Sequence, residues 1–139
     1  MATITPLAAH LRVVIARTAR RLRQEAGTDL SPSQTAALAT IERRGPVTPS
    51  ELASIERIQR PTATRVIARL EEAGWVSRAA DPADGRSSLV SMTADGRALL
   101  ERVRANKDAF LARRLEGLDR DDRATLERAA EILERVLDE

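Results

Sequence analysis

Apolar residues recur along the chain at the spacing of helix faces, and this pattern predicts a mainly helical protein. The first helix is expected from about Pro6 to Ala26, where Gly27 is a natural terminator. The residues that form a stripe along one face of this helix are Leu7, Leu11, Val14, Ile15, Thr18 and Leu22. Further helices are expected over 32–44, 49–56 and 58–74, from Thr93 to about Leu115, and from Asp119 towards the C-terminus.

Helix starts are marked three times by a hydroxyl residue followed by proline, at Thr5, Ser31 and Thr48. The hydroxyl oxygen can accept a hydrogen bond from a free backbone amide, and proline at the first helical position gives up an amide that would have no partner. Gln34 and Glu51 stand three residues after two of these caps. This spacing predicts two capping boxes.

The segment 58–74 has two contrasting faces. Its apolar positions fall at i, i+3, i+4 and i+7 and predict a buried face of Ala63, Val66, Ile67 and Leu70. The opposite face is small, polar and basic, and consists of Pro61, Thr64, Arg65 and Ala68, with Thr62 and Arg69 at its margins.

Two short strands are expected after this helix, which Gly74 ends. The first strand begins after Trp75, the second covers residues 87–92, and one arginine, Arg86, lies at the tip between them. The connecting loop contains the turn-forming residues Asp81, Pro82, Asp84 and Gly85.

The first helix and the last two carry more apolar surface than the short middle segments can cover. In the last helix the stripe comprises Leu126, Ala130, Leu133 and Leu137. A second copy of the chain would bury this surplus, whereas a monomer would leave an apolar patch. We therefore expect a homodimer.

Composition excludes several classes of protein. Cysteine is absent, which removes disulfide scaffolds, thiolate nucleophiles and cysteine-based zinc sites. A single histidine, no tyrosine and no glycine-rich phosphate loop argue against an enzyme, and we expect neither a cofactor nor a metal. No export signal or apolar run of about 20 residues occurs, so we expect a cytoplasmic protein without membrane contact.

The order of a helix, a short helix, a helix with a basic outer face and a hairpin is that of a winged helix-turn-helix. Such a helix enters the major groove of double-stranded DNA, and an arginine on a hairpin can enter the narrow minor groove. The net charge is only +2, so DNA binding requires a local arrangement of arginines. Arg86 is the expected minor-groove probe.

The segment PTATRVIARLEEAGWVSRAADPADGRSSLVSMTADG, from Pro61 to Gly96, resembles the recognition helix and wing of the MarR family of bacterial transcription factors. Its wing matches that family's D-x-x-D-x-R pattern, and the helix order is similar over essentially the whole chain. The resemblance implies one domain over residues 1–139. Residues 31–97 would form the DNA-binding lobe, and residues 1–30 and 98–139 a dimerisation lobe.

This resemblance also implies residue roles. Thr62, Thr64 and Arg65 would meet the major groove and Arg86 the minor groove, while Asp84 would help to hold the wing. Pro61 and Arg69 complete the expected DNA-binding set, and Asp81 is a second wing support.

Family members are usually homodimeric repressors that bind palindromic operators and are released by small anionic or phenolic ligands. Candidate effector residues are His10, Arg17 and Trp75, for which core packing or a solvated surface is the alternative. The chain lacks the cysteine of peroxide-sensing members, and without tyrosine an aromatic-lined pocket would depend on Trp75 or Phe110.

Two alternatives remain open at this point. Arg65 and Arg69 could be ordinary solvated charges, and Arg86 could form a salt bridge within its loop to Asp81 or Asp84. At the level of function, a winged helix can serve only for contact with another protein, without specific DNA binding.

Overall fold

A computed structural model describes residues 3–138, which form six α-helices and one antiparallel hairpin. The mainly helical fold with a two-stranded wing is therefore confirmed. Residues 1, 2 and 139, which the single-domain prediction includes, lie outside the described residues. The elements are α1 (Ile4–Glu25), α2 (Pro32–Arg44), α3 (Pro49–Glu56), α4 (Arg60–Glu72), β1 (Val76–Ala80), β2 (Ser88–Met92), α5 (Ala94–Glu116) and α6 (Arg120–Leu137).

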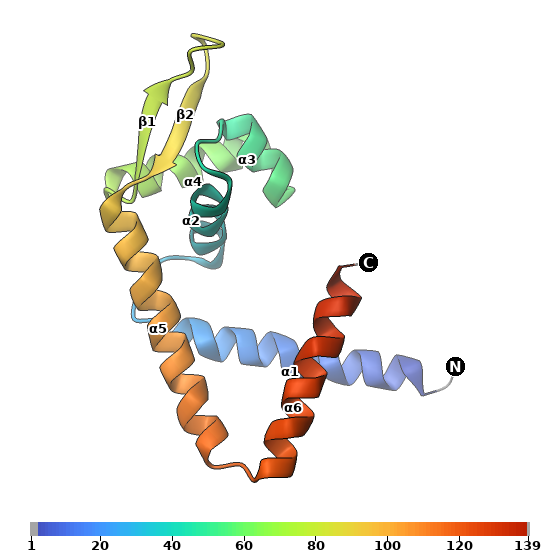
Figure 1. The fold of residues 1–139 in the computed structure, drawn as a ribbon. Coiled ribbons are helices and arrows are strands. Elements are labelled where there is room, and N and C mark those ends of the chain that lie inside the picture. The colour runs from blue at the N-terminus through green and yellow to red at the C-terminus, as the bar shows by residue number, and fades with distance from the viewer. Residues whose placement is uncertain (1–2, 139) are drawn as a thin grey trace.

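One core holds the middle of the chain together. Helices α2, α3 and α4 pack around it with the base of the hairpin, and the first half of α5 closes it (Figure 1). Trp75 packs against the same core at the foot of the wing. The largest fully buried side chains are Leu38, Ile41, Leu52, Ile67, Leu70, Leu100, Val47 and Val90.

The hairpin is tied to the helical body by a bridge that the pattern did not predict. Strands β1 and β2 pair from Val76 opposite Met92 to Ala80 opposite Ser88. Val47, in the loop before α3, exchanges two backbone hydrogen bonds with Val90 of β2, at 3.0 and 2.8 Å. A single paired residue has no periodicity, so a sequence pattern carries no signal for it.

The predicted caps are partly right. Ser31 and Gln34 form the full capping box, and Thr93 and Asp119 each accept an amide hydrogen bond at the start of the last two helices. The second box is wrong. The Glu51 carboxylate accepts a hydrogen bond from the Thr48 hydroxyl at 3.2 Å, whereas a capping box requires it to accept one from the Thr48 backbone amide. The Thr48 hydroxyl still caps α3 by accepting from the Glu51 amide.

The predicted start of the first helix is also wrong. Helix α1 begins at Ile4 with Thr3 as its N-cap, so Thr5 and Pro6 lie inside the first turn. Amides of the first turn have no partner one turn earlier, and Pro6 therefore removes no hydrogen bond that the helix would otherwise make. A hydroxyl and proline pair marks a first turn but does not define its first residue.

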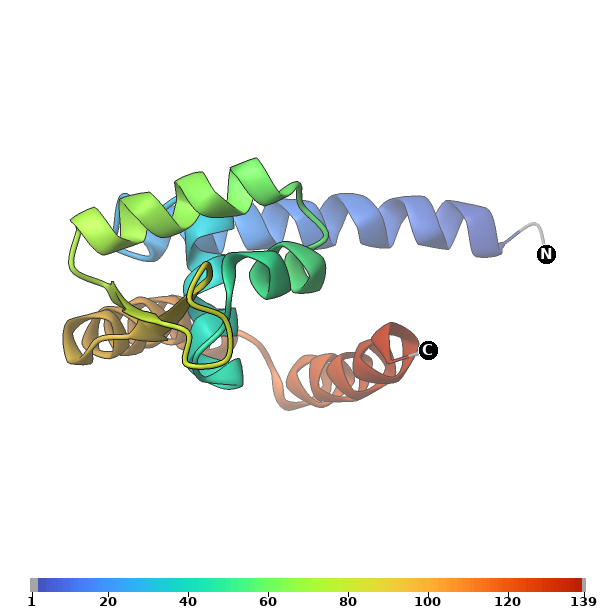
Figure 2. The same cartoon turned by 90° about the horizontal axis from the view of Figure 1, so that it is seen from above.

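Helices α1 and α6 extend away from the body, as Figures 1 and 2 show. Neither helix has a buried residue. Apolar side chains along both are exposed, up to 63% for Val136 and 83% for Leu137. Among residues 3–138, no helix combines the length and hydrophobicity needed to cross a membrane.

Two polar contacts connect α5 to the elements beside it. The Asn106 side-chain amide donates to the carbonyl oxygen of Ala26 at 2.9 Å, just after α1 ends. Arg104 forms a 2.9 Å ion pair with Glu42 of α2. Helix α5 is thus attached both to the outer helix α1 and to the central body.

The junction of the wing and α5 is tightly packed. The Thr93 backbone amide donates to the Trp75 carbonyl oxygen at 3.1 Å, and the Thr93 hydroxyl donates to the Gly74 carbonyl oxygen at 2.7 Å. A Cβ atom on Gly96 would lie only 2.2 Å from the Trp75 carbonyl oxygen. Only glycine allows α5 to approach the strand this closely.

We expect Gly96→Ala to destabilise the protein by about 1–3 kcal/mol, because the new methyl group meets backbone that cannot move away. The free energy of unfolding from urea denaturation measures this loss. Gly85→Ala is the matched control, since a Cβ atom there would have no neighbour within 4 Å. Equal stability of the two variants would contradict the packing argument.

Candidate nucleic-acid interface

The orientation of α4 agrees with the predicted faces. Ala63, Ile67 and Leu70 are buried, and Val66 is half-buried. Burial of this stripe turns the opposite face to solvent. On that face Pro61, Thr64, Arg65 and Arg69 are exposed, while Thr62 and Ala68 are half-buried.

Hydrogen bonds orient part of this exposed face. The Thr64 hydroxyl donates to the Arg60 carbonyl oxygen at 3.0 Å, which leaves its oxygen free to accept from an outside donor. The Arg65 guanidinium donates to the Thr62 hydroxyl at 3.4 Å. Within residues 3–138, neither Arg65 nor Arg69 forms an ion pair. Their positive charges are therefore available to a partner.

A hollow of about 220 Å³ lies between this face and the start of α2. Arg65 and Arg69 line this hollow together with Ser31 and Gln34, the capping residues of α2. Sequence reasoning missed the contribution of α2, because only tertiary packing brings these distant segments together. The hollow is lined by Ser31, Gln34, Thr62, Arg65, Val66 and Arg69.

The wing loop is held by its two predicted carboxylates. Asp81 accepts a hydrogen bond from the Ala83 amide at 2.9 Å, and Asp84 accepts one from the Arg86 amide at 3.0 Å. Both are local side-chain-to-backbone bonds that stabilise turns. Among the described residues, no ion pair involves Arg86. Asp84 thus holds the backbone of Arg86 and leaves its exposed guanidinium free.

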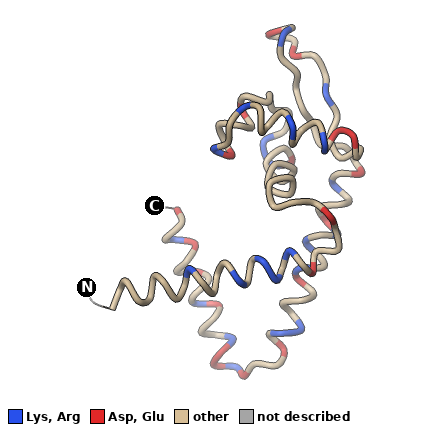
Figure 3. The backbone as a smooth tube through the Cα atoms, turned by 180° about the vertical axis from the view of Figure 1, so that it is seen from behind, with Lys and Arg blue, Asp and Glu red and all other residues tan. Residues whose placement is uncertain are grey.

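An ion pair joins the wing to α4. Arg78 of β1 lies 3.2 Å from the Glu71 carboxylate near the end of α4. Figure 3 shows basic positions along α4 and at the tip of the hairpin. The hairpin and α4 are thus connected by a side-chain contact as well as by the chain between them. No sequence periodicity relates Glu71 to Arg78, so this contact was not predicted.

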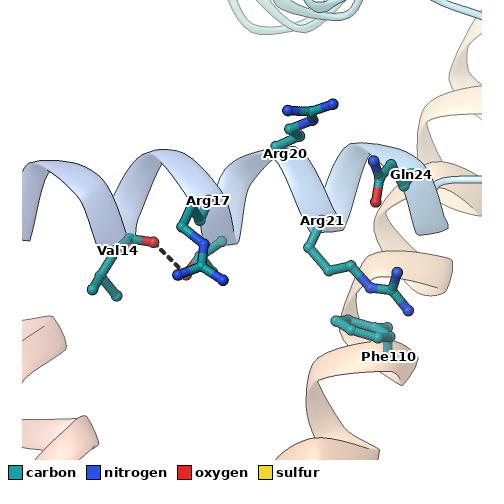
Figure 4. A pocket seen from close by; sticks show the side chains of 7 residues that line it. Val14, Arg17, Arg20, Arg21, Gln24 and Phe110 are labelled. Atoms are coloured by element: carbon teal, nitrogen blue, oxygen red, sulfur yellow. Dashed lines mark hydrogen bonds between the residues drawn. The ribbon is translucent and has the colours of Figure 1, made fainter.

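A second feature is a groove of about 530 Å³ along α1 (Figure 4). Two guanidiniums lie over the Phe110 ring of α5, with the Cζ carbons of Arg21 and Arg114 5.1 and 5.0 Å from its centroid. Arg21 also pairs with Glu25 at 2.9 Å, whereas Arg17 and Arg20 have no ion pair among the described residues. The groove is lined by Val14, Arg17, Thr18, Arg20, Arg21, Gln24 and Phe110.

The three candidate effector residues are not brought together. Arg17 lines the groove, but His10 and Trp75 do not. His10 is exposed on α1, and Trp75 packs against the core. The sequence allowed Arg20 and Arg21, like Arg17, to pair with an anionic effector, with a solvated face or salt bridges between subunits as the alternative. It gave no signal for their position near Phe110, which α5 brings across from a distant part of the chain.

Comparison with known proteins identifies the family. A family model described as MarR family matches residues 30–88. The multiple antibiotic resistance protein MarR of Salmonella typhimurium is 34% identical over 100 residues, which cover 71% of this chain and 69% of that protein. The chain belongs to the MarR family.

Other comparisons cover nearly the whole chain. An uncharacterized HTH-type transcriptional regulator of Mycobacterium bovis is 40% identical over 134 residues, 96% of this chain and 94% of that protein. A putative transcriptional regulator from Pseudomonas aeruginosa has a TM-score of 0.89 and 37% identity, covering 99% of this chain and 97% of its own. A mutant of MarR from E. coli complexed with operator DNA has a TM-score of 0.68 and 29% identity, and the match covers 94% of this chain and 95% of that one.

This MarR-family chain is therefore a helix-turn-helix transcriptional regulator that binds DNA. The relatives and structural neighbours named above are described as transcriptional regulators or as MarR. The exposed face of α4 and the tip of the wing both carry arginines that form no ion pair among the described residues.

We expect Asp84→Ala to weaken DNA binding by about threefold to tenfold, because the Arg86 amide loses its acceptor and the wing tip loosens. Asp84→Asn keeps an acceptor oxygen and removes a negative charge, so this variant should bind at least as tightly as the wild type. Fluorescence anisotropy with DNA from upstream of the chain's own gene measures both. Equal losses in the two variants would show that the charge of Asp84, and not its acceptor oxygen, matters.

Proposed function

We propose that this chain is a homodimeric, sequence-specific repressor that binds a palindromic operator and is released by a small anionic or phenolic ligand. It would act in the cytoplasm, where bacterial DNA is found. The observation that carries the proposal is the combination of an exposed basic face on α4 with Arg86 at the wing tip, whose guanidinium is free of the two wing carboxylates.

Reading of the DNA follows from the shape of this surface. The major groove is wide enough to admit an α-helix such as α4, and Thr64 and Arg65 would reach base edges there. Arg69, beside the hollow at the start of α2, would contact a backbone phosphate. Arg86 would reach into the minor groove, whose negative potential is greatest where it is narrow.

Support for a dimer comes from the outer helices. A stable monomer rarely leaves this much apolar side chain in water, and the exposed set runs along both α1 and α6. Residues 1–30 and 98–139 would form the dimerisation lobe, and residues 31–97 the DNA-binding lobe of one domain. A two-fold axis would repeat the α4 surface in the opposite orientation, which suits a palindrome with half-sites about 34 Å apart.

The groove along α1 supports a ligand-release mechanism. Arg17 and Arg20, which have no ion pair among the described residues, attract an anion, and Val14 and Phe110 contribute apolar atoms to the lining. Helix α5 carries Phe110 and is attached to α2 through Arg104 and Glu42. A ligand can bind more tightly to a dimer whose two DNA-binding lobes are spaced differently from the half-sites of the operator. Such a ligand would shift the dimer towards that spacing and weaken operator binding.

The first test replaces Arg65 and Arg86 together by alanine. We expect the wild type to prefer its own upstream DNA over a scrambled duplex, and the double variant to lose most of this preference, about tenfold or more. Anisotropy titrations at two salt concentrations measure affinity. Sedimentation of the complex should give two chains for each operator.

Arg120→Ala is the matched control, because it removes one charge at the start of α6, far from the wing (Figure 1). Its operator affinity should equal that of the wild type. If the double variant instead binds DNA as the wild type does, the alternative of a winged helix used for protein contact is favoured.

The second test addresses ligand release. We expect benzoate, a small aromatic carboxylate, to weaken operator binding by the wild type. In Arg17→Ala the benzoate concentration needed for half of this effect should rise about tenfold, because one cation of the groove is gone. Operator titrations with and without benzoate measure the response. Benzylamine, which has the opposite charge, is the control. Operator affinity that is unchanged by benzoate and by phenolic compounds would refute release through this groove.

A further inference from the structure

The turn between α3 and α4 contains an arginine in an unfavourable backbone conformation. Arg57 has φ 54° and ψ 45°, in the left-handed region, and it is the only residue other than glycine with a positive φ among residues 3–138. A Cβ atom crowds the backbone there, so glycine or asparagine usually occupies such a position.

The fold requires this backbone conformation but does not require arginine. The turn is closed by backbone hydrogen bonds, from the Arg57 amide to the Ser54 carbonyl oxygen at 3.3 Å and from the Ile58 amide to the Ala53 carbonyl oxygen at 3.0 Å. The Arg57 side chain is exposed and forms no ion pair among the described residues. Folding alone therefore gives no reason for a long cationic side chain at this point.

A second arginine follows directly on α4. Arg60 is exposed and stands one turn before Thr64, whose hydroxyl donates to the Arg60 carbonyl oxygen. Residues four apart share a helix face, so Arg60 extends the exposed face of α4 towards the turn. Within residues 3–138, Arg60 also has no ion pair.

If α4 enters the major groove, this corner would lie near the phosphates of the bound duplex. In a helix-turn-helix the first residues of the recognition helix enter the major groove, while the preceding helix crosses the DNA backbone. Figures 1 and 2 show α3 and α4 meeting at this turn. Side chains at the turn would therefore face the edge of the groove, where the partner groups are phosphate oxygens.

We propose that Arg57 and Arg60 form a phosphate clamp at the corner between α3 and α4. The clamp rests on the proposed function, in which α4 enters the major groove. Guanidinium groups bind phosphate oxygens with paired hydrogen bonds, which makes arginine better suited to this contact than a point charge. Because every base pair carries the same phosphates, the clamp adds affinity and leaves the choice of sequence to α4 and the wing.

The test uses Arg57→Gly and Arg57→Asn in the full-length protein. Both residues tolerate the left-handed conformation, so the thermal midpoint should not fall. We expect DNA affinity to drop about threefold to tenfold for the operator and the scrambled duplex alike. The slope of log affinity against log salt concentration should decrease by about 0.9 for one lost phosphate contact, and by about twice that when Arg60→Ala is added.

Two controls bracket the result. Arg57→Lys keeps the charge and should retain most of the salt slope, whereas Arg120→Ala removes a remote charge and should leave the slope unchanged. Wild-type slope and affinity in Arg57→Gly and Arg57→Asn would overturn the clamp while leaving operator reading by α4 intact. A loss confined to the operator would also overturn it, since Arg57 would then read bases.

The proposed function has its own distinguishable failure. A wild type that binds both duplexes equally would refute sequence-specific reading by α4. If the salt slope still decreased in Arg57→Gly under those conditions, the phosphate clamp would be supported on its own. Absence of any salt-dependent DNA binding by the wild type would overturn both.

Discussion

Burial of Ala63, Ile67 and Leu70 determines how α4 is rotated about its own axis. Each of these side chains is at most 1% exposed, so turning the helix would bring apolar surface into water and polar groups into the core. The opposite face, with Thr64 and Arg65, is consequently held outward. The proposed DNA-binding surface depends on this packing more than on any interaction that its own exposed residues make.

The wing depends on the same core. Val90 of β2 is fully buried and pairs with Val47, while Val76 packs at the start of β1. The hairpin is thereby anchored at its base, and the Arg78 contact with Glu71 connects it to α4. A side chain at the wing tip and a side chain on α4 can then meet one duplex in a reproducible geometry, because both belong to the same packed unit.

Helix α5 has two environments along its length. Leu99, Leu100 and Val103 lie in the core, and Phe110 lies further out beneath Arg21 of α1. The Asn106 bond to Ala26 lies between these two regions. Helix α5 therefore connects the groove along α1 to the packed core of the central body.

Local signals in the sequence predicted most elements of the fold, because caps, apolar stripes and turn residues act within a few positions of one another. The stripe through Ala63 and Leu70, the Ser31 capping box and the Asp84 turn are of this kind. These signals also selected the exposed residues of α4 and the tip arginine of the wing. They misplaced the start of α1 and the second capping box, because a hydroxyl residue before proline fits several positions of a first helical turn.

Only the tertiary structure decided which distant segments meet. The bridge between Val47 and Val90, the ion pair between Glu71 and Arg78, and the seat of Phe110 beside α1 join residues with no shared periodicity. The left-handed backbone of Arg57 was also not predicted, because arginine carries no local signal for a conformation that glycine or asparagine usually adopts. The sequence by itself determined which surfaces are apolar or basic, because burial and charge are properties of side chains. Their placement in space followed from packing, which depends on all elements at once.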